Sequence, residues 1–69
     1  MKTQTQILVK HRRTKAYLQD ENKWTGSALF ARPFESTYQA LHFCVDKEME
    51  ETDIVFRFPD QREVRFLRC

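Results

Sequence analysis

Apolar and polar residues alternate most regularly near the end of the chain. Residues 53–58 carry a large apolar side chain at every second position, namely Ile54, Phe56 and Phe58. Successive side chains of a β-strand point to opposite faces, so this spacing predicts a strand with one apolar face. Residues 63–68 alternate again after a turn-forming segment that contains proline. We therefore predict a β-hairpin formed by these two segments.

The register of this hairpin follows from matching the apolar faces of its strands. A three-residue tip at 60–62 pairs Phe56 with Phe66. A two-residue tip would instead pair Phe56 with Arg65 and bury charge, because a slip of one residue turns every side chain to the other face. We expect the first register, which also sets Arg57 directly opposite Arg65.

A second hairpin is predicted near the start of the chain. Residues 6–10 are rich in residues that favour strands, and residues 16–19 resume this character after a charged interruption. If residues 12–14 form the loop, Val9 pairs with Tyr17, and the neighbours of both residues point to the opposite face. Along the chain, one hairpin then precedes a central helix and the other follows it.

Ser36 and Gln39 predict the start of that helix. Their spacing is that of a capping box, in which the serine hydroxyl accepts a hydrogen bond from the backbone N–H of Gln39, and the Gln39 side chain reaches back to the N–H of Ser36. The helix is expected from residue 37 to about residue 48. No glycine follows it, and acidic residues near its end oppose the helix dipole. Its apolar arc is formed by Tyr38, Ala40, Leu41, Cys44 and Val45.

The order strand, strand, helix, strand, strand predicts an α+β fold. One helix of this size can cover one face of a four-stranded antiparallel sheet, which leaves the other face open. Residues 1–69 are expected to form a single domain, because the chain is too short for two. Chains near this size bury only about 60% of the surface that they expose when unfolded. Residues 24–34 are left unassigned, although Pro33 places them at an edge of the sheet or outside it.

The composition favours a water-soluble globular chain. Hydrophobic residues make up 41% of it, charged residues make up 32%, and there is a single glycine, which argues against a disordered or linker-rich chain. No apolar run approaches the roughly 20 residues of a membrane span, and no signal-peptide core follows the N-terminus. We therefore expect a cytoplasmic protein that does not bind membranes.

No motif for catalysis, for a cofactor or for a metal is found. His11 and His42 are far apart and lie on different predicted elements, and no Cys-x-x-Cys pair occurs. Cys44 is expected as a small buried hydrophobe and Cys69 as an exposed terminal thiol. We expect no enzyme activity, no cofactor and no small-molecule substrate, because a chain this short has little room for a pocket of several hundred Å³.

The formal net charge of +2 hides an uneven distribution. The first 15 residues carry five basic side chains and no acid, whereas residues 46–53 carry five acids against Lys47 alone. Such asymmetry bears on the choice of partners and not on the fold.

The open face of the expected sheet is the first candidate binding surface. Apolar centres surrounded by arginine are typical of protein interfaces, and arginines directly across a strand pair repel each other unless an anion bridges them. We expect this face to bind another protein or a second copy of the chain. The alternative is that the arginine stems only cover the apolar side chains. The residues expected at this face are Leu8, Leu18, Val55, Arg57, Arg65 and Leu67.

The tip of the first hairpin is the second candidate. Its concentrated positive charge could straddle a phosphate backbone, so nucleic-acid binding is the alternative function. The structural alternative is a solvated tip that protects the edge of a sheet. The residues of this tip are Lys10, His11, Arg12, Arg13 and Lys15.

One segment resembles known families. Trp24 is followed by the pattern A-x-x-F-x-S-x-x-Q-A-x-x-F, which runs from Ala31 to Phe43. The pattern resembles one found in short uncharacterised bacterial and phage proteins, and is similar to the strand-to-helix junction of the WGR module and of the small N-terminal domain of some ribonucleases H. It covers about 20 of the 69 residues. Thr25 follows Trp24 where the WGR module has glycine, and the glycine-rich strands of the ribonuclease H module are missing. The resemblance therefore implies a fold, and no nucleic-acid contacts are carried over.

Overall fold

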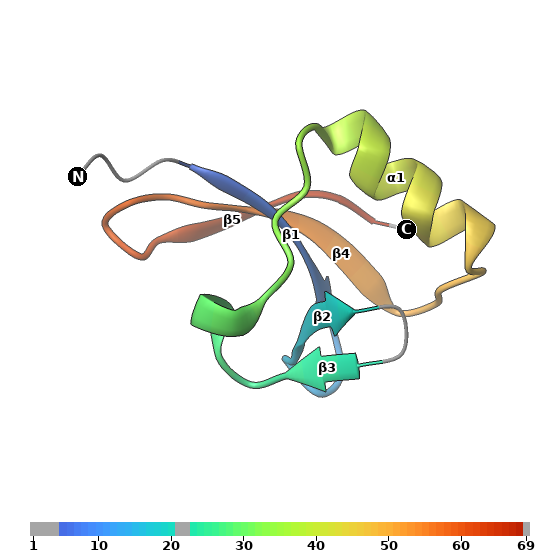
Figure 1. The fold of residues 1–69 in the computed structure, drawn as a ribbon, viewed down its shortest axis with the longest axis horizontal. Coiled ribbons are helices and arrows are strands. Elements are labelled where there is room, and N and C mark those ends of the chain that lie inside the picture. The colour runs from blue at the N-terminus through green and yellow to red at the C-terminus, as the bar shows by residue number, and fades with distance from the viewer. Residues whose placement is uncertain (1–4, 21–22, 69) are drawn as a thin grey trace.

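Five antiparallel strands and one α-helix make up the fold in a computed structural model that describes residues 5–20 and 23–68 (Figure 1). The strands are β1 (Gln6–His11), β2 (Tyr17–Asp20), β3 (Lys23–Thr25), β4 (Thr52–Arg57) and β5 (Glu63–Arg68). The helix is α1 (Thr37–Asp46), and a short 3₁₀ turn, η1 (Ala28–Phe30), precedes it. The predicted α+β class is confirmed.

The predicted number of strands, four, is wrong because β3 adds a fifth strand to the sheet. Trp24 lies opposite Leu18, and Thr25 lies opposite Tyr17, so β3 pairs antiparallel with β2. A strand of three residues is too short to display alternation in the sequence, and only its partner reveals it.

The two hairpins meet at the centre of the sheet, where β1 lies beside β4 in the strand order β3-β2-β1-β4-β5. β1 pairs with β4, which places Leu8 opposite Val55 and Val9 opposite Ile54. All four side chains are buried, because strands with a neighbour on each side and a covered face lie deepest in the molecule. The helix α1 connects the first half of the chain to β4 (Figure 1).

The first hairpin forms one residue out of the predicted register. Tyr17 lies opposite Lys10 and not opposite Val9, since the N–H of His11 donates to the carbonyl of Ala16 at 2.8 Å. The loop therefore has four residues, 12–15. This slip reverses the faces of β2, so that Leu18 shares the helix side with Val9, and Tyr17 lies on the other side.

The second hairpin is also shifted from the predicted register, here by two residues. Val64 lies opposite Phe56, and Glu63 lies opposite Arg57 where Arg65 was expected. A β-bulge next to this pairing leaves Phe66 without a directly opposite residue on β4. The ring of Phe66 still contacts that of Phe56, with 5.0 Å between their centroids. An opposite charge thus replaces the like charge that the predicted register placed across from Arg57.

The start of the helix agrees with the prediction. The hydroxyl of Ser36 accepts from the N–H of Gln39 at 3.1 Å, and α1 begins at the next residue after Ser36. The Gln39 side chain accepts from the N–H of Glu35 at 3.2 Å, one residue before the predicted donor. The N-terminal cap is therefore local and readable from the sequence.

The helix ends at Asp46, two residues earlier than predicted. Glu48 takes a left-handed conformation with φ of 50°. Its N–H donates to the carbonyl of Val45 at 3.1 Å, and the N–H of Met49 donates to that of Cys44 at 3.0 Å. These two bonds form a Schellman motif, in which Glu48 occupies the position that usually carries glycine.

The helix covers one face of the sheet, as predicted. Val9, Leu18 and Ile54 are buried against the helix residues Ala40 and Cys44, and Phe34 completes this core. Tyr38 and Val45, expected on the apolar arc, are instead exposed, at 70% and 65%. The half-buried Phe43 packs against Phe34 in their place, with 5.5 Å between ring centroids.

The opposite face is not open at its centre, which corrects the prediction. Leu8, Tyr17 and Val55 form a second buried cluster, covered by Ala31 and the partly buried Ala28. The unassigned segment 24–34 supplies this cover. It then crosses to the helix side, tied by the N–H of Arg32 to the carbonyl of Leu18 and by the N–H of Phe34 to that of Ile7. A hollow on this face lies toward β5 and the first hairpin loop.

Candidate functional site

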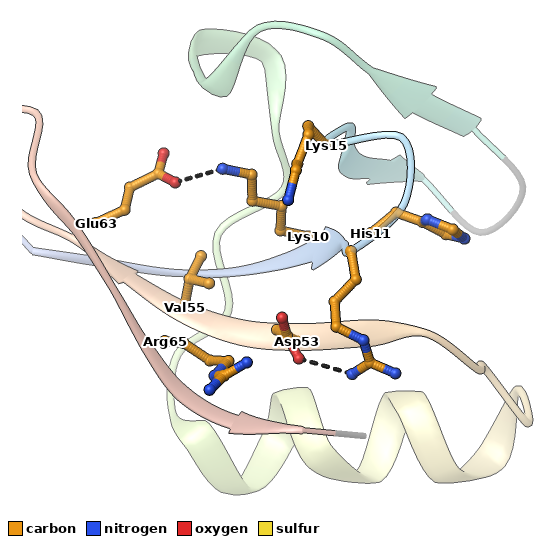
Figure 2. Close-up of a pocket in the computed structure, with 8 residues that line it drawn as sticks. Lys10, His11, Lys15, Asp53, Val55, Glu63 and Arg65 are labelled. Atoms are coloured by element: carbon orange, nitrogen blue, oxygen red, sulfur yellow. Dashed lines mark hydrogen bonds and ion pairs between the residues drawn. The ribbon is translucent and has the colours of Figure 1, made fainter.

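A hollow of about 330 Å³ lies on the sheet face that faces away from the helix (Figure 2). Its walls come from β1, the first hairpin loop, β4 and β5, so residues from both ends of the chain meet there. The side chains that line it are Lys10, His11, Arg12, Lys15, Asp53, Val55, Glu63 and Arg65. Charged groups dominate this lining, with four cations from lysine and arginine against two carboxylates.

Glu63 organises one side of the hollow. Its Oε1 accepts from Lys10 Nζ at 2.9 Å, and its Oε2 accepts from Arg57 at 2.7 Å and from the Tyr17 hydroxyl. The registers explain this convergence, because Arg57 lies opposite Glu63 and Lys10 lies opposite Tyr17. The carboxylate is largely shielded, with 17% of its side chain exposed.

This arrangement shifts three pKa values. Burial alone would raise the pKa of Glu63, but the hydrogen bonds from Tyr17, Lys10 and Arg57 outweigh it, so this pKa lies below its ordinary value. The pKa of Tyr17 is raised by burial and by its hydrogen bond to Glu63. Burial lowers the pKa of Lys10, yet the bond to Glu63 and the attraction of its charge raise it overall. The cluster therefore holds a carboxylate and an ammonium group in their charged forms at neutral pH.

Arg12 and Arg13, at the tip of the first hairpin, are paired with carboxylates of the same chain. Arg12 donates to Asp53 at 2.9 Å, and Arg13 donates to Glu51 at 2.7 Å. The backbone N–H of Arg12 also donates to the carbonyl of Glu51 at 2.7 Å. Pairing of β1 with β4 thus brings the acidic segment beside the basic tip. Part of the tip's positive charge is neutralised within the molecule.

Lys15 and Arg65 differ from the other cations of the hollow. Within residues 5–20 and 23–68, neither has an ion-pair partner. The backbone of Lys15 is left-handed, with φ of 65°. Its side chain extends from the first hairpin loop and lies on the same side of the sheet as Lys10 (Figure 2). Arg65 stands on the exposed strand β5, opposite the buried Val55. Two cations are therefore left to attract an external anion.

His11, the remaining residue of the tip, borders the hollow but turns its ring away from it (Figure 2). Its Nδ1 accepts from the backbone N–H groups of Arg13 and Thr14, at 3.1 and 3.3 Å. Its ring meets the edge of Trp24 at 5.5 Å between centroids, so it points away from the charged groups (Figure 2). Of the predicted tip, the structure places Lys10, Arg12 and Lys15 around the charged part of the hollow.

The predicted protein-binding residues divide into three groups. Leu8 and Leu18 are fully buried, and Val55 is 5% exposed, so the expectation that they form an exposed surface is wrong. The cause is the slipped register of the first hairpin for Leu18, and the cover by segment 24–34 for the other two. Leu67 is exposed but lies opposite Ile54, on the helix side of the sheet.

The two predicted arginines do lie on the same side of the sheet, away from the helix. Arg57 is held by Glu63, whereas Arg65 has no ion-pair partner in the described part of the chain. Sequence reasoning missed Glu63 as the centre of the charged cluster. The signal was present, because a three-residue tip moved back by one position, to residues 59–61, sets Glu63 opposite Arg57 and removes the like-charge pair.

Neither a metal centre nor a membrane-spanning helix occurs in the described part of the chain. In the described part of the chain, no group of three or more histidine, cysteine, aspartate or glutamate residues is placed to hold a metal ion. The one α-helix in this part is too short and too polar to cross a membrane. Cys44 of α1 is buried, as expected, but it is disulfide-bonded and not a plain buried hydrophobe. Cys69 lies outside the described residues.

Comparisons with protein-family models, with curated proteins and with solved structures find no match for this chain. The resemblance suggested by the segment from Trp24 to Phe43 therefore stays a prediction.

Proposed function

We propose that this chain is a small non-enzymatic interaction protein that binds an acidic segment of another protein at the cationic hollow. The observation that carries the proposal is the pair Lys15 and Arg65, which line the hollow without an ion-pair partner in the described chain. A carboxylate entering the hollow would meet both charges. Arginine suits this role because its planar guanidinium can donate two parallel hydrogen bonds to one carboxylate.

The neighbouring ion pairs support the same function. Lys10 and Arg12 are held in place by Glu63 and Asp53, so the lining is ordered before a partner arrives. An ordered site costs less entropy on binding than one formed by mobile side chains. The surplus of positive charge would also speed the encounter with an acidic partner.

Burial of Leu8, Leu18 and Val55 changes the kind of contact that we propose at this face. With these side chains inside the molecule, the accessible part of the face is polar, and charge rather than apolar area would carry specificity. A second copy of the chain fits less well, because its basic face would meet the same basic face.

Nucleic acid is the second candidate ligand, through the tip residues Arg12 and Arg13. Both are paired with carboxylates, so a phosphate backbone would have to displace Asp53 and Glu51. The five basic residues of the tip therefore offer fewer free charges than their number suggests. For this reason we rank nucleic acid after an acidic protein segment.

The test is binding of a fluorescently labelled glutamate-rich peptide, followed by anisotropy. We expect the affinity to fall as NaCl rises toward about 0.15 M, where the screening length is about 8 Å. The double variant Lys15→Glu, Arg65→Glu should bind at least about tenfold more weakly, equal to about 1.4 kcal/mol.

The control is Lys23→Glu, which makes one charge reversal of the same kind on β3, away from the hollow. It should bind nearly as well as the wild type, and circular dichroism should show all variants folded. Equal affinity of the double variant and the wild type would contradict the proposal, as would no binding at low salt. Tighter binding of duplex DNA than of the peptide would favour the second candidate.

A further inference from the structure

We infer that the acidic partner segment binds in an extended conformation, as a sixth strand along the free edge of β5. This inference rests on the proposed function and adds the shape and residue pattern of the ligand. The segment should alternate acidic residues, which face the arginines of β5, with apolar residues on the helix side. Three features of β5 lead to this conclusion.

The first feature is an open edge. β5 is the last strand in the order β3-β2-β1-β4-β5, and in the described chain it pairs with β4 alone. An edge strand presents a row of backbone N–H and C=O groups that can pair with another chain. The other edge of the sheet is β3, whose three residues give a partner far less to bind than the six residues of β5.

The second feature is the side of β5 that faces away from the helix. Arg65 lies opposite Val55, and Arg68 lies opposite Asp53, so both arginines stand on the face that carries the hollow. Neither has an ion-pair partner among the residues that the structure describes. A strand laid beside β5 would place its own side chains next to these charges, which favours acidic residues there.

The third feature is the apolar helix side of β5. Val64 and Phe66 are exposed at 50% and 51%, and Leu67 at 39%. The helix packs mainly over β1 and β4, and these three side chains of β5 keep much of their surface exposed. Apolar residues of an added strand would shield them from water, since every second side chain of such a strand points to this side.

The charges also argue against a second copy as the occupant. Pairing of two β5 strands would bring Arg65 and Arg68 of one copy beside the same residues of the other. The acid of this strand, Glu63, already accepts from three donors of its own chain. A different protein that supplies acidic residues fits the edge better.

The bulge in β5 is compatible with this mode. It interrupts regular pairing near Phe66, and bulges at sheet edges reduce indiscriminate pairing with other strands. We therefore expect the partner to be selected by its residue pattern, and not to be any extended chain.

The test compares peptides of equal length. The first alternates glutamate with valine, the second has the same composition in two blocks, and the third alternates lysine with valine. We expect the alternating acidic peptide to bind at least about tenfold more tightly than either of the others. The variant Arg65→Glu, Arg68→Glu should lose this preference, while Lys23→Glu should keep it.

Backbone pairing is tested on the peptide, which leaves the protein unchanged. Two versions of the alternating acidic peptide carry N-methyl groups on every second residue, one on the glutamates and one on the valines. Only alternate residues of an added strand face β5, so at least one version should bind about tenfold more weakly than the parent. If both versions bind as tightly as the parent, the strand model is wrong.

The outcomes separate this inference from the proposed function. If the alternating and block peptides bind equally and both need Lys15 and Arg65, the acidic ligand is correct and its strand form is wrong. If no acidic peptide binds, both fail. Self-association of the wild type through β5, measured by light scattering and lost in the variant Arg65→Glu, Arg68→Glu, would show that a second copy is the occupant and would overturn the inference.

Discussion

Glu63 illustrates how a single side chain can join its own strand to three others. It is carried by β5, and its donors Lys10, Tyr17 and Arg57 come from β1, β2 and β4. A carboxylate with several charge-assisted hydrogen bonds in a shielded position contributes more than an exposed ion pair. The charged cluster is therefore part of the scaffold. Lys15 and Arg65, which have no ion-pair partner among the described residues, are the cations of the hollow that we propose for ligand binding.

We expect Glu63→Gln to lower the free energy of unfolding by about 1–2 kcal/mol at neutral pH, because the charged acceptor is lost while the shape is kept. The pKa of Glu63 lies below its ordinary value in the folded state. Its contribution is thus fully present above the unfolded pKa of about 4.3 and is lost as the pH falls through the lower folded pKa. Urea unfolding at a series of pH values measures it.

The control for this experiment is Glu50→Gln, which changes an exposed residue outside the cluster. It should alter stability by less than about 0.5 kcal/mol. A difference between wild type and Glu63→Gln that stays constant from neutral pH down to acid would contradict the role of the charge.

At the scale of elements, each end of α1 is determined locally, but in different ways. The N-terminus has the favourable cap Ser36, whereas the C-terminus places Glu48 in a left-handed conformation that suits glycine. A left-handed conformation costs an ordinary residue roughly 1–2 kcal/mol, and a negative charge at this end also opposes the helix dipole. The helix therefore ends where the hydrogen bonds of the cap allow it, despite an unfavourable residue.

We expect Glu48→Gly to raise the melting temperature, with a gain of up to about 1 kcal/mol in the free energy of unfolding. Glycine relieves the backbone strain, and the loss of the acid removes an unfavourable interaction with the dipole. Differential scanning calorimetry measures the change. Glu50→Gly is the matched control, since Glu50 is not among the residues with positive φ, and it should stabilise the protein little or not at all. Destabilisation by Glu48→Gly would contradict the cap.

At the scale of the whole molecule, a second layer of cover decides what the surface can do. The segment from η1 to Phe34 seals the centre of the face that was expected to be open, and moves the accessible part toward β5 and the first hairpin loop. A binding face of apolar centres thereby becomes a charged hollow and a free strand edge. The ligand that we propose changes accordingly, from a protein bound at an apolar face to an acidic segment bound by cations.

We expect Leu8→Ala to destabilise the protein by about 2–4 kcal/mol, because Leu8 is fully buried and its loss leaves a cavity. An exposed Leu8 on an open face would instead cost less than about 0.5 kcal/mol. Chemical unfolding distinguishes the two. The control is Leu67→Ala, at a residue that is 39% exposed on the edge strand, where the loss should be clearly smaller.

The sequence by itself determined the features that depend on near neighbours along the chain. Four strands and the start of the helix follow from alternation and from the cap at Ser36, and the α+β class follows from their order. These signals are local, because side-chain periodicity and capping involve residues within a few positions of each other.

Only the tertiary structure decided the registers, the fifth strand and the cover of the second face. In the first hairpin, a register shift of one residue buries Leu18 under the helix. In the second hairpin, a register shift of two residues places Glu63, and not Arg65, opposite Arg57. Such choices depend on pairings between distant residues, of which the ion pair between Arg12 and Asp53 is one. Distant pairs compete over the whole chain, and packing selects among them, so local patterns do not reveal which cations stay free to bind.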